Sequence, residues 1–229
     1  MQILRELYLD NPVSNYFARG SIRRYAKGEL ILQAYELPDA ISSIAEGYVQ
    51  AYSINSRGEQ YVHILLKKGD IFPLWWLTDT TPQNMYYQAI SPTTLHSLPR
   101  ENLLAKLQTN QTLAFQFIQT TLQQLKIYED RIDNLEFKYA SERLAYRLLY
   151  MAYRFGERSG DEITIKAPVT QQMIAGSVNL SRESVAREME KLHRKGYIEY
   201  RDKHIVIRNV DLLSQVVKDI EHADWWKTL

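Results

Sequence analysis

Two arginines and a glutamate stand close together in the segment SRESVAREMEKLHRKG, and their side chains could read the edges of DNA bases. Arg182 and Glu183 directly follow a serine, and Arg187 lies one helical turn beyond Glu183. A guanidinium forks onto guanine O6 and N7, and a carboxylate accepts a hydrogen bond from cytosine N4. The alternative is a solvated helix face, because Glu183 and Arg187 are four residues apart and one can orient the other.

The surrounding residues predict two short helices joined by a tight turn. Thr170 is expected to cap QQMIAGSV, and Ser181 is expected to cap the next helix, which ends at Gly196. Asn179 suits the turn because asparagine tolerates a left-handed backbone. The two helices share a predicted buried stripe, made of Ile174, Val178, Val185, Met189 and Leu192.

Two strand-like runs, YIEYR and KHIVIR, follow at once and predict a hairpin around Asp202-Lys203. A hairpin after a helix–turn–helix is a wing, and the first turns of the second helix would then enter the major groove. Thr170, Ser181 and Lys191 are candidates for phosphate contacts, which position a protein without reading sequence. Residues 138–208 carry 14 Lys and Arg against nine Asp and Glu, so this segment is basic while the whole chain is only +1. That balance suggests a polyanion partner, although chance could also produce it.

Residues from about 20 to 98 predict a small all-β barrel or sandwich. The runs IRRYA, ELILQ, AISSIAE, YVQAYSI, QYVHILL and TTLHSL are rich in β-branched and aromatic residues. Glycines at 28, 47, 58 and 69 punctuate them at spacings typical of short strands and turns.

Helix spacing begins after Pro99, breaks around Thr109-Asn110 and then predicts one long helix from about Gln111 to Leu135. Apolar residues recur at heptad spacing along it, with a second set three residues further on. We interpret this seam as a dimerisation surface, and the alternative is a helix packed on its own barrel. The predicted seam is Ile118, Thr121, Leu125, Tyr128, Ile132 and Leu135. A further helix, from Ala140 to Phe155, is expected to end at Gly156 as its C-cap.

Composition excludes several classes of site. The 229-residue chain has no cysteine, which rules out disulfides, thiolate zinc sites, cysteine-ligated iron–sulfur clusters and a cysteine nucleophile. No apolar run approaches the ~20 residues of a membrane span. MQILRELYLDNP lacks the apolar core of a signal peptide, so we expect a cytoplasmic protein. The five histidines are scattered, and His63 is expected to be structural rather than a metal ligand.

The stretch NLSRESVAREMEKLHRKGYIE resembles the signature of the Crp/Fnr family, the cyclic-AMP receptor protein and fumarate–nitrate-reductase regulators. ASERLAYRLLYMA is similar to the helix that leads into that family's DNA-binding domain, and EGYVQAYSINSRGEQYVHILLKKGDIF to its β-roll. The resemblance implies that Arg182, Glu183 and Arg187 contact base pairs and that Ser181 contacts a phosphate. It also implies a homodimer that works with RNA polymerase and reads a TGTGA-like half-site.

The cassette that holds a cyclic nucleotide in the family departs from its pattern here. In the family, a G-D-x-F-G-E motif is followed by an Arg-Ser-Ala run. In this chain Gly69-Asp70-Ile71-Phe72 is followed by PLWWL, and Gln83-Asn84 stand near the position of the family's Arg-Ser pair. An anionic nucleotide would lack its charge-assisted partner, so cyclic AMP is disfavoured and the effector is unknown. The aromatic run could line an apolar ligand pocket, fill the core or contact another domain. The candidate pocket residues are Phe72, Leu74, Trp75, Trp76, Gln83 and Asn84.

We therefore expect an α+β protein in three parts. A β-roll sensor-like domain spans residues 1–109, a dimerisation helix spans 110–137, and a winged helix-turn-helix domain with a C-terminal extension, ADWWKTL at its end, spans 138–229. The predicted function is sequence-specific binding of double-stranded DNA by a dimeric transcription regulator, without catalysis, metal or resident cofactor. The alternatives are a cupin-like barrel that binds a small molecule or metal, and a winged-helix interaction or replication protein.

Overall fold

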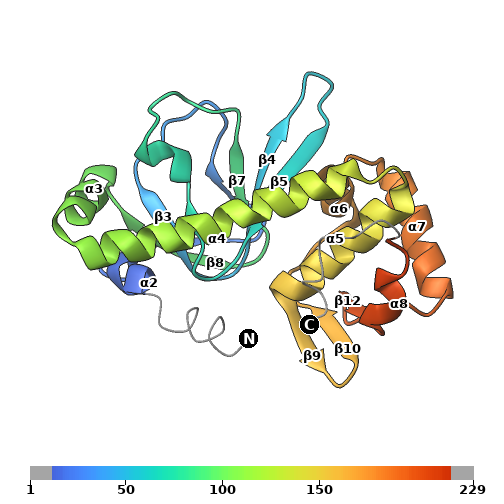
Figure 1. Ribbon diagram of the computed structural model, residues 1–229. Coiled ribbons are helices and arrows are strands. Elements are labelled where there is room, and N and C mark those ends of the chain that lie inside the picture. Colours follow the sequence, from blue (N-terminus) through green and yellow to red (C-terminus); the bar gives the residue numbers. More distant parts are fainter. Residues whose placement is uncertain (1–11, 218–229) are drawn as a thin grey trace. The chain divides into compact units, whose positions relative to one another are not determined.

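The computed structural model describes residues 12–217, which form two compact units (Figure 1). The boundary lies between Tyr128 and Glu129, inside the long helix α4 (Gln111–Glu136). That helix is the segment that the sequence set apart as a dimerisation element. The terminal ADWWKTL lies outside the described residues.

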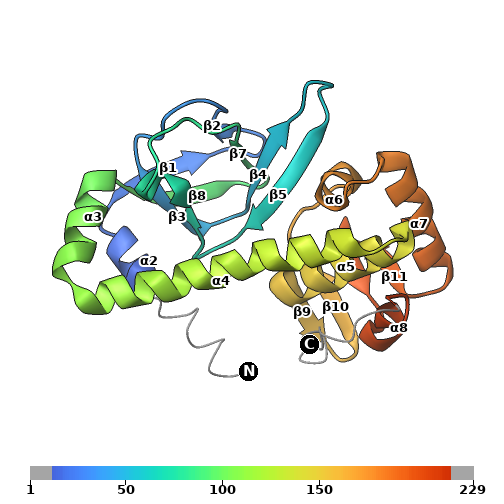
Figure 2. The same ribbon diagram turned by 45° about the horizontal axis from the view of Figure 1, so that its top comes forward.

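Unit 1 is built on two four-stranded antiparallel sheets, ordered β1-β8-β3-β6 and β2-β7-β4-β5 (Figure 2). All six predicted runs form strands, and the α+β class with an N-terminal β domain is confirmed. The strands are β1 (Ser21–Tyr25), β2 (Leu30–Leu32), β3 (Ile41–Glu46), β4 (Val49–Ile54), β5 (Gln60–Leu66), β6 (Ile71–Phe72), β7 (Tyr86–Ala89) and β8 (Thr93–Leu98). β6 and β7 were not predicted.

The glycines that punctuate these strands sit where the backbone turns. Gly28, Gly47, Gly58 and Gly69 all have φ between +79° and +90°, a region that other residues enter at a cost. At Gly47 a Cβ would also lie 2.4 Å from the Pro92 carbonyl oxygen. The expected turns are therefore fixed by backbone geometry.

Three helices pack on the sheets of unit 1: α2 (Pro12–Phe17), α3 (Arg100–Thr109) and the first part of α4. They share one apolar core with the strands, made of Val13, Phe17, Ile41, Ile71, Leu98, Leu103, Leu113 and Phe117. Gln124 of α4 is also buried, and its amide makes two hydrogen bonds to one strand residue. Its Nε2 donates to the Ile71 carbonyl at 3.0 Å, and its Oε1 accepts from the Ile71 N–H at 3.1 Å. This amide clamp ties α4 to strand β6.

Helix α4 has two heptad faces with opposite roles. One face is buried and packs within the described chain through Leu113, Phe117, Thr120, Gln124 and Ile127. The other is exposed and apolar: Ile118, Leu125 and Ile132 expose 54%, 50% and 61% of their surface. Phe115 and Leu122 extend this exposed stripe and were missed, whereas Thr121 and Leu135 of the predicted seam are half-buried and Tyr128 is 38% exposed. The helix thus covers its own barrel and still presents an apolar stripe.

Beyond the end of α4, the described part of unit 2 contains four helices and a small sheet of order β11-β12-β10-β9. Its elements are α5 (Ala140–Phe155), β9 (Gly156–Ser159), β10 (Glu162–Ile165), α6 (Gln171–Val178), α7 (Arg182–Arg194), β11 (Ile198–Arg201), β12 (His204–Ile207) and α8 (Val210–Ser214). Helix α5 contacts α6, α7 and α8, so its buried apolar residues form the centre of this unit.

Gly156 ends α5 as predicted, but for a different reason. Its φ of −84° and ψ of 144° are extended, not left-handed, and it begins the unpredicted strand β9. A Cβ at this position would lie 2.2 Å from the Ala152 carbonyl oxygen and 2.4 Å from Ile163 Cγ2. Close packing against β10 therefore requires glycine here.

Candidate nucleic-acid interface

The turn between α6 and α7 has the geometry that the sequence predicts. The Thr170 hydroxyl accepts a hydrogen bond from the Met173 N–H at 3.2 Å and caps α6. Asn179 adopts φ 52° and ψ 50°, and its N–H donates to the Ala175 carbonyl. Because Asn179 adopts the left-handed conformation, the chain changes direction at this residue, and α7 begins shortly after it, at Arg182.

Helix α7 begins at a capped end and is anchored by one apolar stripe. Ser181 Oγ accepts from the Ser184 N–H at 3.1 Å, as expected of its N-cap. Val185, Met189 and Leu192 are buried on the side that faces the core, and α6 packs against α7. Because these three side chains hold the helix, the opposite face is left for other contacts.

That opposite face presents Arg182, Glu183 and Arg187, all of them exposed. The pKa of Glu183 lies below its usual value, because its own backbone N–H and the Ser181 side chain stabilise the carboxylate, with smaller help from both arginines. Arg187 Nη2 donates to Ser184 Oγ at 3.4 Å, so serine rather than Glu183 is its hydrogen-bond partner. The first turns of α7 thus offer two cations and one ionised acid to solvent.

The three candidates for phosphate contacts are also exposed, but each already has a role in the free protein. The Thr170 and Ser181 hydroxyls cap their helices through one oxygen lone pair each. The Lys191 ammonium lies 2.7 Å from Glu188 Oε1 in an ion pair. The neighbouring carboxylate offsets part of the positive charge that Lys191 presents to solvent.

The predicted wing is a two-stranded hairpin, β11 and β12, whose turn residues Asp202 and Lys203 have φ of 50° and 66°. Two residues with positive φ are typical of a type I′ turn, which matches the twist of a hairpin. The wing therefore lies where the sequence placed it, directly after α7 and Gly196.

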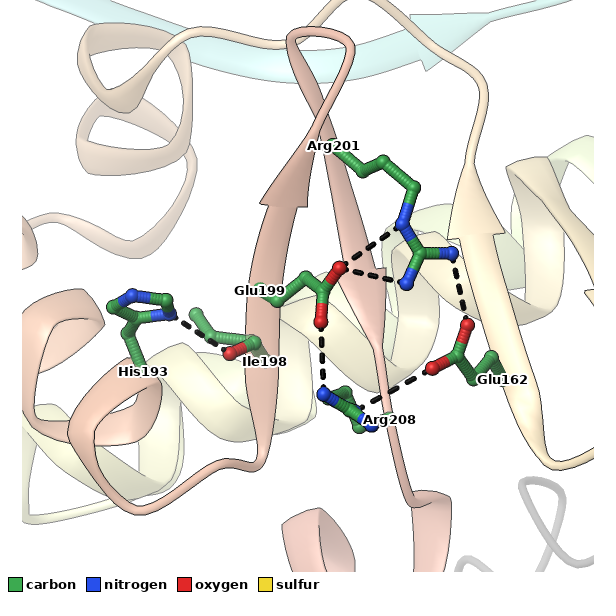
Figure 3. Close-up of polar contacts among 6 residues, drawn as sticks. All are labelled: Glu162, His193, Ile198, Glu199, Arg201 and Arg208. Atoms are coloured by element: carbon green, nitrogen blue, oxygen red, sulfur yellow. Dashed lines mark hydrogen bonds and ion pairs between the residues drawn. The ribbon is translucent and has the colours of Figure 1, made fainter.

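A ring of four charges that sequence reasoning missed joins the wing to β10 (Figure 3). Arg201 pairs with two acids: its Nη2 lies 2.7 Å from Glu199 Oε1, and its Nη1 lies 2.9 Å from Glu162 Oε2. Arg208 pairs with the same two acids: its Nη1 lies 3.0 Å from Glu199 Oε2, and its Nε lies 3.4 Å from Glu162 Oε1. Arg201 is the main cause of the lowered pKa of Glu162. The spacing of these residues in the sequence gives no signal, because only the register of β10 and β12 brings them together.

Helix α7 is tied to the wing by a second polar contact. The Nδ1 atom of His193 lies 3.1 Å from the Ile198 carbonyl oxygen of β11 (Figure 3). The contact joins the last turn of the helix to the first residue of the strand. The position of α7 is thus held at both of its ends, by Ser181 at the start and by His193 at the end.

The candidate pocket residues of unit 1 are mostly engaged in the structure of the barrel itself. Phe72 is buried and stacks on Tyr87 with ring centroids 4.9 Å apart. Leu74 and Trp76, in the 3-10 helix η1 (Leu74–Leu77), pack against the apolar core.

Trp75 lies edge-on to Trp76, with ring centroids 5.9 Å apart, so the two indoles contact each other. Gln83 Nε2 donates to Asp79 Oδ2 at 3.2 Å and to the Thr81 carbonyl at 3.1 Å. Asn84 is exposed, and its Nδ2 lies 3.5 Å from the Ile54 carbonyl oxygen. These contacts favour the core-filling interpretation for Leu74 and Trp76.

Within residues 12–217, no three His, Asp or Glu side chains come close enough together to hold a metal ion. His63 Nε2 instead lies 2.7 Å from the Ser53 hydroxyl oxygen. None of the helices in this part of the chain combines the length and the apolar character that a membrane crossing needs.

Two family models match the chain, one over each unit. Residues 22–110 match the cyclic nucleotide-binding domain, and residues 142–216 match the Crp-like helix-turn-helix domain. The chain belongs to the Crp/Fnr family of transcription regulators. The second match contains α6, the turn, α7 and the wing, so the exposed triplet lies in a DNA-binding domain of this family.

Curated relatives of the Crp/Fnr family match most of the chain. The global nitrogen regulator of Synechococcus elongatus is 26% identical over 85% of this chain and 88% of its own length. The cyclic AMP receptor protein of Thermus thermophilus is 25% identical over 88% and 89%. The fumarate nitrate reduction regulatory protein of Klebsiella oxytoca is 24% identical over 83% and 76%.

Solved structures show the same fold. FixK2 from Bradyrhizobium japonicum superposes with a TM-score of 0.75 at 24% identity, covering 89% of this chain and 98% of its own. A CooA mutant from Carboxydothermus hydrogenoformans has a TM-score of 0.74 at 19% identity, with 93% and 94% covered.

Proposed function

We propose that the chain is a homodimeric regulator that reads an inverted repeat of TGTGA through Arg182, Glu183 and Arg187. The observation that carries the proposal is the division of α7 into a buried stripe and an exposed, charged first turn. In this proposal the two arginines each fork onto a guanine, and Glu183 accepts from a cytosine N4. The lowered pKa of Glu183 favours the carboxylate form, in which both oxygens can accept a hydrogen bond.

Selection of bound sequences from a random DNA pool is the direct test. We expect enrichment of TGTGA facing its inverted copy TCACA, with centres about 34 Å apart along the duplex. A pool that returns no inverted repeat would contradict the base-reading role. Binding without any preference would instead favour the winged-helix interaction or replication protein.

The dimer is supported by the exposed stripe of α4. Phe115, Ile118, Leu122, Leu125 and Ile132 line one face at alternating spacings of three, four, three and seven residues, which suits pairing with a second α4. An apolar stripe of this length on a single chain would otherwise remain in water. Light scattering at micromolar concentration should report about twice the 26.9 kDa chain mass. A monomer, with and without DNA, would contradict the proposal.

We also propose that cyclic AMP is not the effector. No arginine stands at Gln83-Asn84, and the Gln83 amide is already bonded to Asp79 and Thr81. A nucleotide phosphate would therefore meet no cation at that position. Calorimetric titration should show no saturable binding at physiological nucleotide levels, and a micromolar Kd would overturn this part. RNA polymerase as the partner and a cytoplasmic location complete the proposal, both by family resemblance.

A further inference from the structure

Asn134 is a polar residue at a buried position near the end of α4. It exposes 1% of its surface, whereas Ile132, two residues earlier, exposes 61%. Two residues turn an α-helix by about 200°, so these two side chains lie on nearly opposite faces of the same turn. Ile132 belongs to the exposed apolar stripe on which the proposed dimer depends, and both residues lie in unit 2. One turn of α4 thus offers an apolar side chain to a second copy and a polar one to its own chain.

The amide of Asn134 joins α4 to the first turn of α5, which runs back beside the last turns of α4 (Figure 1). The Asn134 Nδ2 atom donates to the Arg143 carbonyl oxygen at 2.8 Å. Only three residues separate the two helices, and the last of them is Tyr139. The N–H of Tyr139 donates to the Glu142 carboxylate at 3.2 Å. The junction between α4 and α5 is therefore a short turn that hydrogen bonds hold in place.

The side chain of Arg143 continues this connection to the helix–turn–helix. Its Nη1 atom donates to the Val178 carbonyl oxygen at 3.2 Å. Val178 is the last residue of α6, and a carbonyl in the last turn of a helix has no partner within that helix. The next residue, Asn179, is the left-handed residue of the turn that leads to α7. We call Asn134, Arg143 and the Val178 carbonyl the α4–α6 link.

The asparagine of this link does not serve stability alone. Its Oδ1 atom is buried and has no hydrogen-bond partner within residues 12–217. An unpaired buried acceptor lowers stability, and an apolar side chain of the same shape would avoid that cost. Apolar packing tolerates small shifts between two helices, whereas a directed hydrogen bond favours one arrangement, as a single buried asparagine does in a coiled coil. These properties suit a contact that fixes the direction of α5 relative to the end of α4.

We propose that Asn134 and Arg143 are positioning residues that set which spacing between two half-sites the dimer accepts. The inference rests on the proposed function, because it needs a dimer formed through α4 and an inverted repeat. In that dimer the apolar stripe holds one α4 against the other, and the α4–α6 link holds α6, on which α7 packs, to its own α4. The distance between the two recognition helices follows from both contacts. Neither residue lies on α7, so the base preference within each half-site is independent of them.

Binding to operators that differ only in the spacing of their half-sites tests the proposal. One added or removed base pair moves a half-site by about 3.4 Å and rotates it by about 35° around the duplex. The unmodified chain should bind the selected spacing about tenfold more tightly than either shifted spacing, which is the loss expected for one forked base contact. Asn134→Leu and Arg143→Met should each lower this ratio by about fivefold, the equivalent of one hydrogen bond. Fluorescence anisotropy at constant salt measures the Kd values.

Stability separates a positioning role from a purely structural one. A leucine side chain has nearly the shape of an asparagine side chain but no unpaired acceptor, so the unfolding midpoint of Asn134→Leu should equal or exceed that of the unmodified chain. A residue with only a structural role would lower the midpoint when it is replaced. Asp133→Asn, which changes an exposed residue of the same turn, is the matched control and should leave both the midpoint and the spacing ratio unchanged.

Arg143→Lys is the conservative variant at the second position of the link. A lysine ammonium can still donate to a carbonyl oxygen, so this variant should restore part of the spacing ratio that Arg143→Met loses. If Asn134→Leu does not fold, the two Arg143 variants make the same comparison, because Arg143 is only half-buried.

Amide hydrogen exchange of the free protein tests the link without DNA. The Leu180 N–H donates to the Ala175 carbonyl at 3.1 Å, two residues beyond the carbonyl that Arg143 holds. Arg143→Met should raise the exchange rate of this N–H by about fivefold, because the turn loses one hydrogen bond that opposes its local opening. Asp133→Asn should not change it.

Three results would overturn the proposal. Asn134→Leu and Arg143→Met could keep the full spacing ratio, or they could lose affinity equally on every spacing and unfold at a lower midpoint, as residues that only support the fold would. The exchange rate of Leu180 could also be unchanged in Arg143→Met, which would mean that the turn is held without the link. A DNA pool that returns no inverted repeat would instead contradict the proposed function and the spacing role with it, while the exchange rate would still report whether the link holds the turn.

Discussion

The start of α7 and the segment from β6 through η1 were both predicted to bind something, and the structure treats them differently. At α7 the candidate base-reading side chains face solvent, and a separate apolar stripe holds the helix. In the β6–η1 segment the candidate side chains themselves form the packing, since Phe72 stacks on Tyr87 and Trp76 joins the core.

Binding and packing can therefore be divided between the faces of one element or combined in the same residues. Where they are divided, as in α7, a substitution can remove function without changing stability. Where they are combined, as in β6–η1, a substitution changes stability first. Three predictions test this distinction, from the largest expected effect to the smallest.

Phe72→Ala should destabilise unit 1 by about 3–5 kcal/mol, because a buried aromatic ring leaves a cavity. Denaturant unfolding measures the loss, and Asn84→Ala is the matched control from the same candidate pocket. Because Asn84 is exposed, Asn84→Ala should lower the free energy of unfolding by no more than about 0.5 kcal/mol. A Phe72→Ala variant that stays within 1 kcal/mol of the parent would mean that the ring lines an open pocket.

Arg182→Ala and Arg187→Ala should each cost about 1–3 kcal/mol of binding to the selected DNA site, because each loses a forked contact to a guanine. Fluorescence anisotropy on matched and single-base variant sites should show that each substitution relaxes the preference at one base pair. The free energy of unfolding should change by no more than about 0.5 kcal/mol. Equal losses of binding free energy on matched and scrambled DNA would mean that Arg182, Glu183 and Arg187 form only a solvated helix face and do not read bases.

Lys191→Ala should weaken binding on all sequences alike and lower the salt slope of binding by about one unit. The effect should be small because Lys191 is already paired with Glu188. Glu188→Gln is the informative partner variant, since it releases Lys191 and should strengthen binding slightly at low salt. Anisotropy titrations across several salt concentrations measure both. A base-specific effect of Lys191→Ala would contradict its assignment to phosphate.

Sequence reasoning succeeded where the determinants are local. Thr170, Asn179 and Ser181 adopt the predicted caps and turn because each acts on backbone groups within a few residues. The hairpin at Asp202-Lys203 is local in the same sense. The base-reading and phosphate roles of the α7 residues stay predictions, although their exposure fits those roles.

Features of the structure that depend on long-range contacts could not be predicted from the sequence. The heptads of α4 admit either Thr121 or Leu122 beside Ile118, and only the packing of Phe117 and Gln124 on the barrel selects Leu122 for the exposed stripe. Strand β9, GERS, is exposed along its whole length and becomes a strand only by pairing with β10. The charge ring around Glu162 likewise depends on strand register.

The amide clamp of Gln124 has a consequence for self-association. Strand β6 is the last strand of its sheet, and an edge strand offers unpaired N–H and C=O groups to any extended chain that meets it. At Ile71 both of those groups are occupied by the Gln124 side chain, which takes the position that a neighbouring strand would fill. The long helix thereby closes a sheet edge, and a chain that associates through α4 is protected there from associating through its strands.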